Sequence, residues 1–330
     1  MQQKIVLALA MAGSASANLF KAAPAHQKYM WESFKAEHGK HYGSAAEERE
    51  RFAVFVENLR LIDERNAAET GTAVHGITKF ADLSPDEFKM GYLNYVAPAA
   101  PNRTMDDSIA ALPAGVDALV DWTGKLTTPV KDQGYCGSCW AFSAVEQIES
   151  DYMREFGSEQ ILSAQQVNSC TQYFIAGGCN GGSTEKAFDY AKGGLETDAD
   201  YPYTSGKAGV TGSCQASSSK FVVKTKSYTT VSNSASGESK MATYVSGTGP
   251  LSVCVDANSW SSYTGGVMSS CGTQVDHCVQ AVGLDTAAGY WKVRNSWGTS
   301  WGESGFIRLS YGSNTCAIAS DANYASTAKY

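Results

Sequence analysis

Apolar residues recur at helical spacing in two segments near the start of the chain. Residues 25–38 place Trp31 and Phe34 on one face. Residues 45–68 carry a longer apolar stripe of the same kind, made of Phe52, Phe55, Val56, Leu59 and Ile62. Each pattern predicts an amphipathic helix whose apolar face needs a partner surface.

Capping signals support these helices and predict a third. Ser44 stands three residues before Glu47, which is a capping-box pattern, and Glu47 is spaced for an i,i+4 ion pair with Arg51. Ser84 followed by Pro85 predicts the start of a short helix, since proline is favoured at the first helical position.

The second part of the chain divides into a helical half and a strand-forming half. From Cys139 to about residue 203 the pattern favours helices, namely residues 139–156, a helix capped by Ser163, and residues 184–192. From residue 221 onward it favours strands, interrupted by a short helix near residues 238–245. The expected strands are 221–231, 251–256, 277–284, 290–295 and 305–309. This organisation predicts an α+β fold with an antiparallel β half and a cleft between two lobes.

Composition and charge narrow the function classes. The chain has 330 residues, 43% of them hydrophobic, which suffices for an ordinary packed core. Its formal net charge is −7 and it has no basic run, so we do not expect nucleic acid as a partner.

The first 17 residues have the features of a secretory signal peptide. Lys4 precedes a short apolar run at residues 5–12, and Ala-Ser-Ala at residues 15–17 forms a cleavage site. The apolar run is too short to span a membrane, so stable membrane insertion is not expected. In an oxidising compartment, nine cysteines suit disulfides plus one reactive thiol.

A segment without periodicity, residues 97–108, is rich in proline and alanine and predicts an exposed linker. It contains the sequon Asn102-Arg103-Thr104, which makes Asn102 a candidate glycosylation site.

The stretch QGYCGSCWAFS, residues 133–143, holds the candidate chemistry. Ser138 is a candidate N-cap for the helix that begins at Cys139, and the positive end of a helix dipole favours a thiolate there. A thiolate is the nucleophilic form of cysteine. The side-chain amide of Gln133 and the backbone N–H of Cys139 can together hold a developing oxyanion.

Three alternatives compete with a catalytic cysteine. Cys136-x-x-Cys139 has the spacing of a redox pair or of half a zinc site, and Cys139 can also be a simple buried thiol. No βαβ pattern precedes the motif, and no second CxxC or HxxxH follows at zinc spacing. The sequence therefore predicts no metal and no cofactor.

The stretch from Gln133 resembles the active-site helix of papain-like cysteine proteases. By resemblance, VDHC at residues 275–278 and VRNSWG at residues 293–298 complete the site. His277 follows Cys139 by 138 residues (277 − 139) and Asn295 by 156 (295 − 139). The first separation matches the family's range of about 130–150 and the second slightly exceeds it.

The resemblance implies a role for each residue. Cys139 attacks a peptide carbonyl, and His277 pairs with it as thiolate and imidazolium and later protonates the leaving amine. Asn295 accepts the other imidazole N–H, Gln133 stabilises the oxyanion, and Trp297 shields the bond between His277 and Asn295.

The N-terminal helices have a resemblance of their own. The spaced residues of the long helix resemble the interspersed motif of cathepsin L-like propeptides, namely Glu47, Arg51, Phe55, Asn58, Ile62 and Asn66. Gly76-x-Thr78-x-Phe80-x-Asp82 resembles the second propeptide motif. The resemblance implies an inhibitory propeptide at residues 18–111 and a mature papain-like domain at residues 112–330. Asp82 is then a candidate acid sensor.

The resemblance also implies a substrate-binding set, which comprises Gly181, Gly182, Ser183, Thr184, Cys254, Val275, Asp276, Cys278, Trp297 and Asp321. Asp321 matches the base of the pocket for the second residue before the cut. A carboxylate there would favour arginine or lysine. The alternative is that Asp321 faces solvent and reads nothing.

For the disulfides, the resemblance suggests Cys136–Cys179, Cys170–Cys214 and Cys271–Cys316. With Cys139 free, Cys254 and Cys278 remain, and they form either a fourth bond or two free buried thiols.

Taken with the resemblance, these features predict a two-lobed papain-like fold preceded by a helical propeptide that acts as an intramolecular inhibitor. The expected activity is that of a monomeric cysteine endopeptidase acting on proteins and peptides, made as a zymogen and activated in acid. The expected location is the secretory pathway, ending in a lysosome-like or vacuole-like compartment or outside the cell. The alternative function is a catalytically silent papain-like binding or inhibitor protein.

Overall fold

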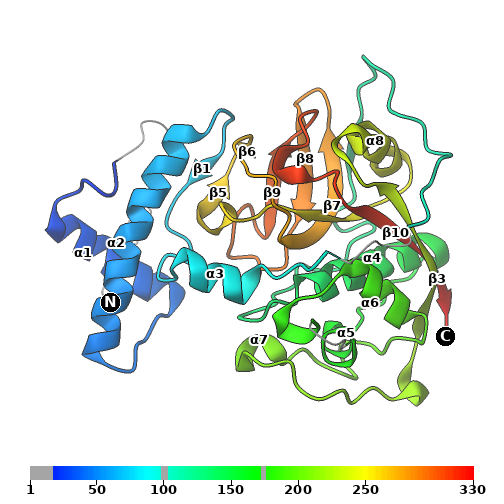
Figure 1. The fold of residues 1–330 in the computed structure, drawn as a ribbon, viewed down its shortest axis with the longest axis horizontal. Helices are drawn as coiled ribbons and strands as arrows, with labels where there is room; N and C mark the ends of the chain where they lie inside the picture. The colour runs from blue at the N-terminus through cyan, green and yellow to red at the C-terminus, as the bar shows by residue number, and fades with distance from the viewer. Residues whose placement is uncertain (1–17, 98–102, 172–175) are drawn as a thin grey trace, which may run out of the picture.

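The computed structural model describes residues 18–97, 103–171 and 176–330. The expected signal peptide at residues 1–17 and the candidate glycosylation site Asn102 lie outside the described residues. Figure 1 shows two long helices set to one side of a two-lobed body, with strands above and helices below. We call residues 18–111 the N-terminal segment.

The two long helices form as the sequence predicts, α1 at Pro24–His38 and α2 at Ala45–Ala68. Gly39 ends α1 in the left-handed conformation, with φ 61°. The apolar faces of the two helices pack on each other in a small core of their own. The most deeply buried side chains of this core are those of Trp31, Phe34, Phe55, Leu59 and Ile62.

Two polar details of α2 differ from the prediction. The Ser44 hydroxyl accepts the Glu47 N–H, but the Glu47 carboxylate accepts the N–H of Gly43, so only half of the capping box forms. Arg51 does not pair with Glu47. Its Nη1 lies 2.8 Å from both carboxylate oxygens of Glu87, on α3 (Pro85–Tyr92), and thereby ties α2 to the next helix.

The described residues of the lower lobe form the helices α4 (Cys139–Phe156), α5 (Ala164–Cys170), α6 (Thr184–Ala191) and α7 (Ser205–Ala208). Every residue of α4 from Cys139 to Met153 is buried, because this helix lies between the lobes. Gly157 ends α4 in the left-handed conformation, as expected. Short 3-10 turns occur at Gly178–Asn180 (η1), Ser218–Lys220 (η2), Ala235–Gly237 (η3), Trp260–Ser262 (η4) and Thr315–Ala317 (η5).

The upper lobe is one sheet with the strand order β3-β10-β4-β7-β8-β9-β6, and β2 pairs with β7. Its strands are β2 (Leu119–Asp121), β3 (Val223–Ser232), β4 (Leu251–Val255), β6 (Val267–Met268), β7 (His277–Asp285), β8 (Tyr290–Arg294), β9 (Phe306–Ser310) and β10 (Ala322–Lys329). The pairing is antiparallel except between β6 and β9, so the expected all-antiparallel β half is corrected at this edge. Helix α8 (Glu238–Gly247) packs on β7.

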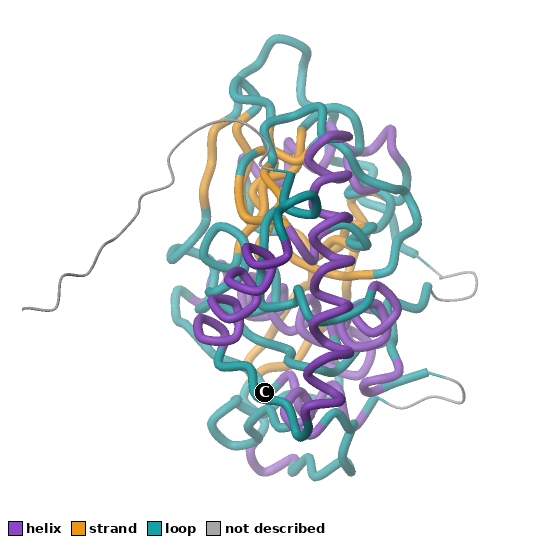
Figure 2. Tube along the Cα trace, turned by 90° about the vertical axis from the view of Figure 1, so that its left-hand side faces the viewer, coloured by secondary structure: helices purple, strands orange, loops and turns teal. Residues whose placement is uncertain are grey.

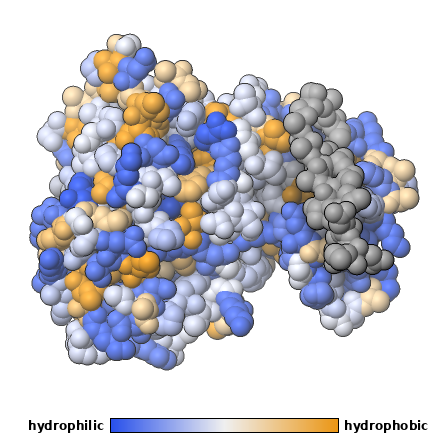
Figure 3. Space-filling view, turned by 180° about the vertical axis from the view of Figure 1, so that it is seen from behind, coloured by the Kyte–Doolittle hydropathy of each residue, from blue (hydrophilic) through white to orange (hydrophobic). Residues whose placement is uncertain are grey.

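The N-terminal segment attaches to the upper lobe through a two-stranded sheet. β1 (Val74–His75) pairs antiparallel with β5 (Tyr263–Gly265). Seen from the side on which α1 and α2 lie, helices stand in front of the strands (Figure 2). From behind, the surface is indented between the part that contains α1 and α2 and the two-lobed body (Figure 3). Chain elements that are far apart in sequence therefore meet at this junction.

Four disulfides join the chain: Cys136–Cys179, Cys170–Cys214, Cys271–Cys316 and Cys254–Cys278. The last one resolves the alternative left open by the sequence. Cys254 and Cys278 lie directly opposite each other on the neighbouring strands β4 and β7, which brings their sulfurs within bonding distance. Cys139 is the free cysteine.

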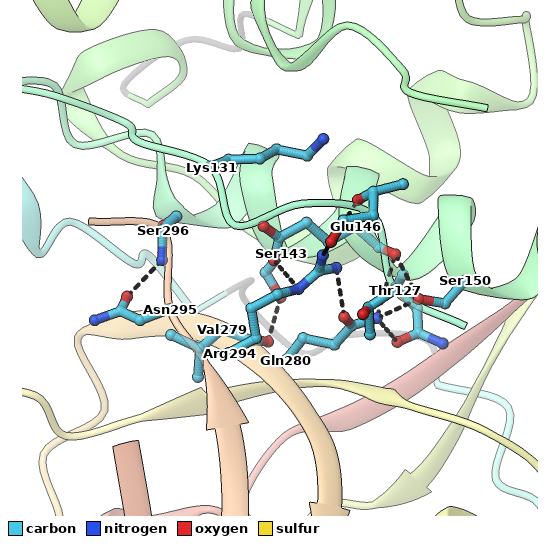
Figure 4. Close-up of polar contacts among 12 residues, drawn as sticks. Thr127, Lys131, Ser143, Glu146, Ser150, Val279, Gln280, Arg294, Asn295 and Ser296 are labelled. Carbon is cyan, nitrogen blue, oxygen red and sulfur yellow. Dashed lines mark hydrogen bonds and ion pairs between the residues drawn. The ribbon is translucent and has the colours of Figure 1, made fainter. Parts of the chain in front are cut away.

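A buried polar network fixes α4 against the sheet (Figure 4). Arg294, at the end of β8, donates to Gln280 Oε1 at 2.6 Å and to the Thr128 carbonyl at 2.6 Å, and its Nε lies 3.6 Å from Glu146 Oε2 on α4. Arg294 and Glu146 are both fully buried. Since the arginine directly precedes Asn295, the network joins the lobes beside the candidate site.

Burial raises the pKa of Glu146 to about 7, although the charges of Arg294 and Lys131 oppose this shift. The pKa of Glu146 is higher in the folded chain than in the unfolded chain, so the protonated side chain that is present in acid does not oppose folding. Its charged form reduces stability as pH rises from about 4.5 through 7. In wild type the free energy of unfolding should therefore decrease between pH 5 and pH 8. We expect this decrease to be about 1–3 kcal/mol smaller in Glu146→Gln.

Urea unfolding at the two pH values measures this effect. The measurement uses a Cys139→Ala background, which excludes the self-cleavage that the sequence leads us to expect. Glu159→Gln, at an exposed position, is the matched control and should change nothing. An unaltered pH dependence in Glu146→Gln would show that Glu146 is not the responsible group.

Candidate active site

Three elements bring the predicted catalytic residues together at the junction of the lobes. Cys139 is the first residue of α4, His277 is the first residue of β7, and Asn295 follows β8 directly. All three side chains are fully buried. The candidate nucleophile thus comes from one lobe and its candidate base from the other.

The hydrogen bonds of Asn295 define the tautomer of His277. The backbone N–H of Ser296 donates to Asn295 Oδ1 at 2.8 Å, which identifies the amide atom that faces the His277 ring as the oxygen. His277 Nε2 lies 2.8 Å from the same oxygen and must therefore carry the hydrogen. In the neutral ring the lone pair is then on Nδ1, which has no hydrogen-bond partner in the described part of the chain. Nδ1 is therefore the ring atom available as a base.

Gln133 is held by a residue to which the sequence analysis gave no role. Ser296 Oγ donates to Gln133 Oε1 at 2.8 Å. This bond turns Gln133 Nε2 toward two carbonyl oxygens, that of Cys136 at 3.0 Å and that of Tyr92 at 3.1 Å. Ser296 stands in the motif quoted above, but its function depends on a contact across 163 residues that no local pattern reveals.

Ser138 does not cap α4 with its side chain, contrary to expectation. Its hydroxyl bonds instead to the hydroxyl of Tyr203 at 2.8 Å. Tyr203 in turn donates to the Gln133 carbonyl at 2.9 Å, so Ser138 braces the loop that carries Gln133.

The protonation states also differ from the sequence prediction. Burial raises the pKa of the Cys139 thiol to about 12, and the opposing effect of the Cys278, Trp140 and Cys139 N–H groups is smaller. Burial likewise lowers the pKa of His277 to about 4, against the opposing hydrogen bond to Asn295. Both shifts favour the uncharged forms, so burial in this form of the chain opposes the expected thiolate and imidazolium.

The N-terminal segment is what covers these groups. Its Tyr92 carbonyl accepts from Gln133 and lies near His277. Farther along, Gly182 donates its N–H to the Asn94 carbonyl at 3.2 Å, and Val96 donates to the Gly182 carbonyl at 2.9 Å. The main chain of the N-terminal segment thus occupies the edge that the sequence analysis assigned to substrate.

The backbone of the N-terminal segment passes close to Gly181 on one side and to Asp276 on the other. Gly181 has φ 97°, and a Cβ atom there would lie 2.1 Å from the Asn94 carbonyl oxygen. On the other side, the N–H of Tyr95 donates to the Asp276 carbonyl at 2.9 Å. Asp276 itself points away, because its carboxylate accepts from Ala257 and Asn258.

Trp297 covers the histidine with its ring. The ring centroids of His277 and Trp297 are 4.8 Å apart, and Trp297 is fully buried. Three aromatic rings of the N-terminal segment pack on the indole, those of Phe80, Phe88 and Tyr92. Together they keep water from the site.

The predicted specificity pocket is occupied as well. Asp321 is 2% exposed, so the alternative that it faces solvent is wrong for this form of the chain. Its Oδ2 accepts from Tyr95 Oη at 2.6 Å and from Arg103 Nη2 at 3.0 Å. Ser183 and Thr184 are buried at the start of α6, and the Cys254–Cys278 bridge lies on the adjoining strands; Val275 is half-buried.

Among the described residues there is no group of three or more His, Cys, Asp or Glu side chains that could hold a metal ion. A helix long and apolar enough to cross a membrane is also absent from the described residues.

Two family models match the sequence. The papain family cysteine protease model matches residues 116–326, and the cathepsin propeptide inhibitor domain (I29) matches residues 31–88. The chain therefore belongs to the papain family of cysteine proteases. It is a cysteine-type peptidase that carries a cathepsin-type inhibitory propeptide, as the resemblance implied.

Similar proteins agree over almost the whole chain. Cysteine proteinase 2 of Leishmania pifanoi is 40% identical, over 96% of this chain and 72% of that protein. Digestive cysteine proteinase 1 of Homarus americanus is 38% identical, over 93% of this chain and 97% of that protein. The solved structure of digestive procathepsin L 3 from Tenebrio molitor larval midgut aligns with a TM-score of 0.76 at 30% identity, covering 91% and 99% of the two chains. These matches confirm the papain-like fold and its zymogen form.

The position of Gln133 gives a prediction for the activated enzyme. If its amide donates to the oxyanion, Gln133→Ala should lower kcat by about 10²–10³ and leave KM nearly unchanged. Ser296→Ala keeps the amide but releases its orientation, so it should give a smaller loss, also in kcat. Steady-state kinetics on a peptide substrate measure both, and a change confined to KM would contradict the assignment.

Proposed function

We propose that Cys139, His277 and Asn295 are the catalytic residues of this peptidase. His277 Nδ1 takes the proton of the Cys139 thiol as Sγ attacks the carbonyl carbon of a peptide bond, and it then gives this proton to the leaving amine as the C–N bond breaks. The resulting thioester is hydrolysed by water, with His277 as base, which restores the thiol. The observation that carries this proposal is the His277 tautomer, since Asn295 leaves Nδ1 as the free basic atom.

The same proposal assigns Gln133 to the oxyanion and residues 181–182 to the substrate backbone. It is supported by the Tyr92 carbonyl, which accepts from Gln133 as a substrate carbonyl would, and by the two hydrogen bonds between Gly182 and the propeptide. In this view the propeptide inhibits by filling the substrate's hydrogen bonds and by keeping Cys139 and His277 dry.

The processing and location of the chain follow from the expected segments. We assign residues 1–17 to a signal peptide, 18–111 to the propeptide and 112–330 to the mature, monomeric enzyme. Four disulfides suit an oxidising compartment, so the chain enters the secretory pathway and acts in a lysosome-like or vacuole-like compartment or outside the cell. Asn102 is the proposed glycosylation site.

The primary test is to acidify the purified full-length protein and assay peptidase activity. Wild type should become active, and Cys139→Ala should remain inactive although it folds, because the nucleophile is missing. Absence of activity in wild type would favour the silent binding protein, and equal activity in the variant would show that Cys139 is not the nucleophile.

Activation in acid requires a group that weakens propeptide docking as pH falls. Asp82, the acid sensor expected from the sequence, has its carboxylate 2.7 Å from Lys40 Nζ and 3.0 Å from Tyr42 Oη. Both partners belong to the propeptide itself.

His75 is a group that can weaken docking as pH falls, and it lies at the junction with the mature domain. Its Nδ1 is 2.9 Å from Ser262 Oγ, and this oxygen accepts a hydrogen bond from Arg65 Nη1 at 2.7 Å. A neutral His75 can accept the Ser262 hydroxyl hydrogen. A protonated ring would place a second cation beside Arg65, with Glu69 as the acid that favours it.

Burial, followed by the Arg65 charge, lowers the pKa of His75 to about 4. The docked state therefore disfavours the proton. The stabilising contribution is complete above the ordinary pKa of 6.5 and is lost as pH falls from there through about 4.

We accordingly expect His75→Gln, which cannot titrate, to shift the midpoint of propeptide processing by about half a pH unit or more toward acid. Processing is followed by electrophoresis across pH 4–7, and the exposed His26→Gln serves as control. An identical pH profile in His75→Gln would exclude His75 as a sensor.

A further inference from the structure

A propeptide arginine binds between two carboxylates of the mature domain. Arg103 Nη2 lies 3.0 Å from Glu185 Oε1 and 3.0 Å from Asp321 Oδ2. The side chains of Glu185 and Asp321 are 4% and 3% exposed, and that of Arg103 is 15% exposed. A guanidinium is thus held almost dry by two acids from separate elements, α6 and the residue before β10.

The two acids are held in place by their own neighbours. Asn323 Nδ2 donates to Asp321 Oδ1 at 2.7 Å, which leaves Oδ2 directed at Arg103. Glu185 stands in the first turn of α6, where Ser183 caps the helix. Its carboxylate is therefore fixed at the positive end of the helix and next to the predicted pocket.

Arg103 does not reach these acids along the cleft. The neighbouring Thr104 carbonyl accepts from the N–H of Thr230 on β3, at 2.8 Å, and Asp106 donates to the Thr230 carbonyl at 2.9 Å. The main chain is thereby anchored on the sheet, and only the Arg103 side chain enters. The Arg103 guanidinium pairs with both acids in the zymogen and leaves when the propeptide is removed.

We propose that Glu185 is a second specificity-determining residue, which works with Asp321 to bind the guanidinium of a substrate arginine at the second position before the cut. The inference rests on the proposed function, since it assigns the substrate of that same cleft. Neither the family motifs nor the sequence analysis singled out Glu185. The geometry identifies it through Arg103.

The chemistry follows from what propeptide removal leaves behind. Two carboxylates then lie close together without the Arg103 cation. Even with Arg103 bound, burial together with the Asp321 charge raises the pKa of Glu185. An entering arginine restores two charge-assisted hydrogen bonds, one to each acid. In the zymogen one guanidinium nitrogen, Arg103 Nη2, serves both acids at once.

The test uses activated enzyme and two peptides that differ only at the second position before the cut, arginine in one and leucine in the other. In wild type the arginine peptide should be cleaved with a kcat/KM at least equal to that of the leucine peptide. Glu185→Gln and Asp321→Asn should each lower the arginine-to-leucine ratio of kcat/KM by about tenfold or more.

Two controls keep the result interpretable. Glu185→Asp retains a carboxylate and should keep a larger share of the arginine preference than Glu185→Gln. Active-site titration with a cysteine-reactive inhibitor corrects each variant for the fraction that folds and activates.

An unchanged ratio in Glu185→Gln overturns the inference, whether or not Asp321→Asn lowers it. If wild type cleaves neither peptide after acid treatment, the proposed function fails, and this outcome is distinct from normal leucine cleavage with an unchanged ratio.

Discussion

Exclusion of water from Cys139 and His277 is the constraint on which the zymogen depends. A thiolate and an imidazolium need either water or each other, and burial penalises both charged forms, which explains pKa values of about 12 for Cys139 and about 4 for His277. The N-terminal segment covers these groups with its Tyr92 carbonyl, with main-chain hydrogen bonds to Gly182, and with aromatic rings packed on Trp297. Under the proposed function, the segment inhibits by desolvation as well as by steric blocking.

The fold supports this arrangement by joining two lobes through one buried helix. Helix α4 brings Cys139 to the junction, and the network of Arg294, Glu146 and Gln280 connects it to the strands that precede His277 and Asn295. A buried ion pair of this type is costly unless its hydrogen bonds are satisfied, and Arg294 satisfies most of its donors through Gln280 and Thr128. The network thereby couples the relative position of the lobes to the geometry of the site.

Local sequence patterns predicted the elements that have strong local signals. The helices beginning after Ser44, Ser84 and Ser163 start where expected, because each serine accepts a hydrogen bond from the N–H three residues later. Strand β10 was missed, since Ala322–Lys329 is a mixture of alanine and polar residues with weak strand preference; it is a strand because β3 and β4 pair with it. The roles of Ser296 and Glu185, and the neutral state of Cys139, depend on contacts between distant segments, which no local pattern contains.

The central claim, that the propeptide keeps Cys139 neutral and dry, is tested most directly by its alkylation rate. Because Cys139 is the free cysteine, iodoacetamide labels it specifically, and intact mass reports the rate. The zymogen at pH 7 should react at least about a hundredfold more slowly than the activated enzyme at the same pH. Equal rates in the two forms would show that the propeptide neither buries Cys139 nor suppresses its thiolate, and would contradict this account.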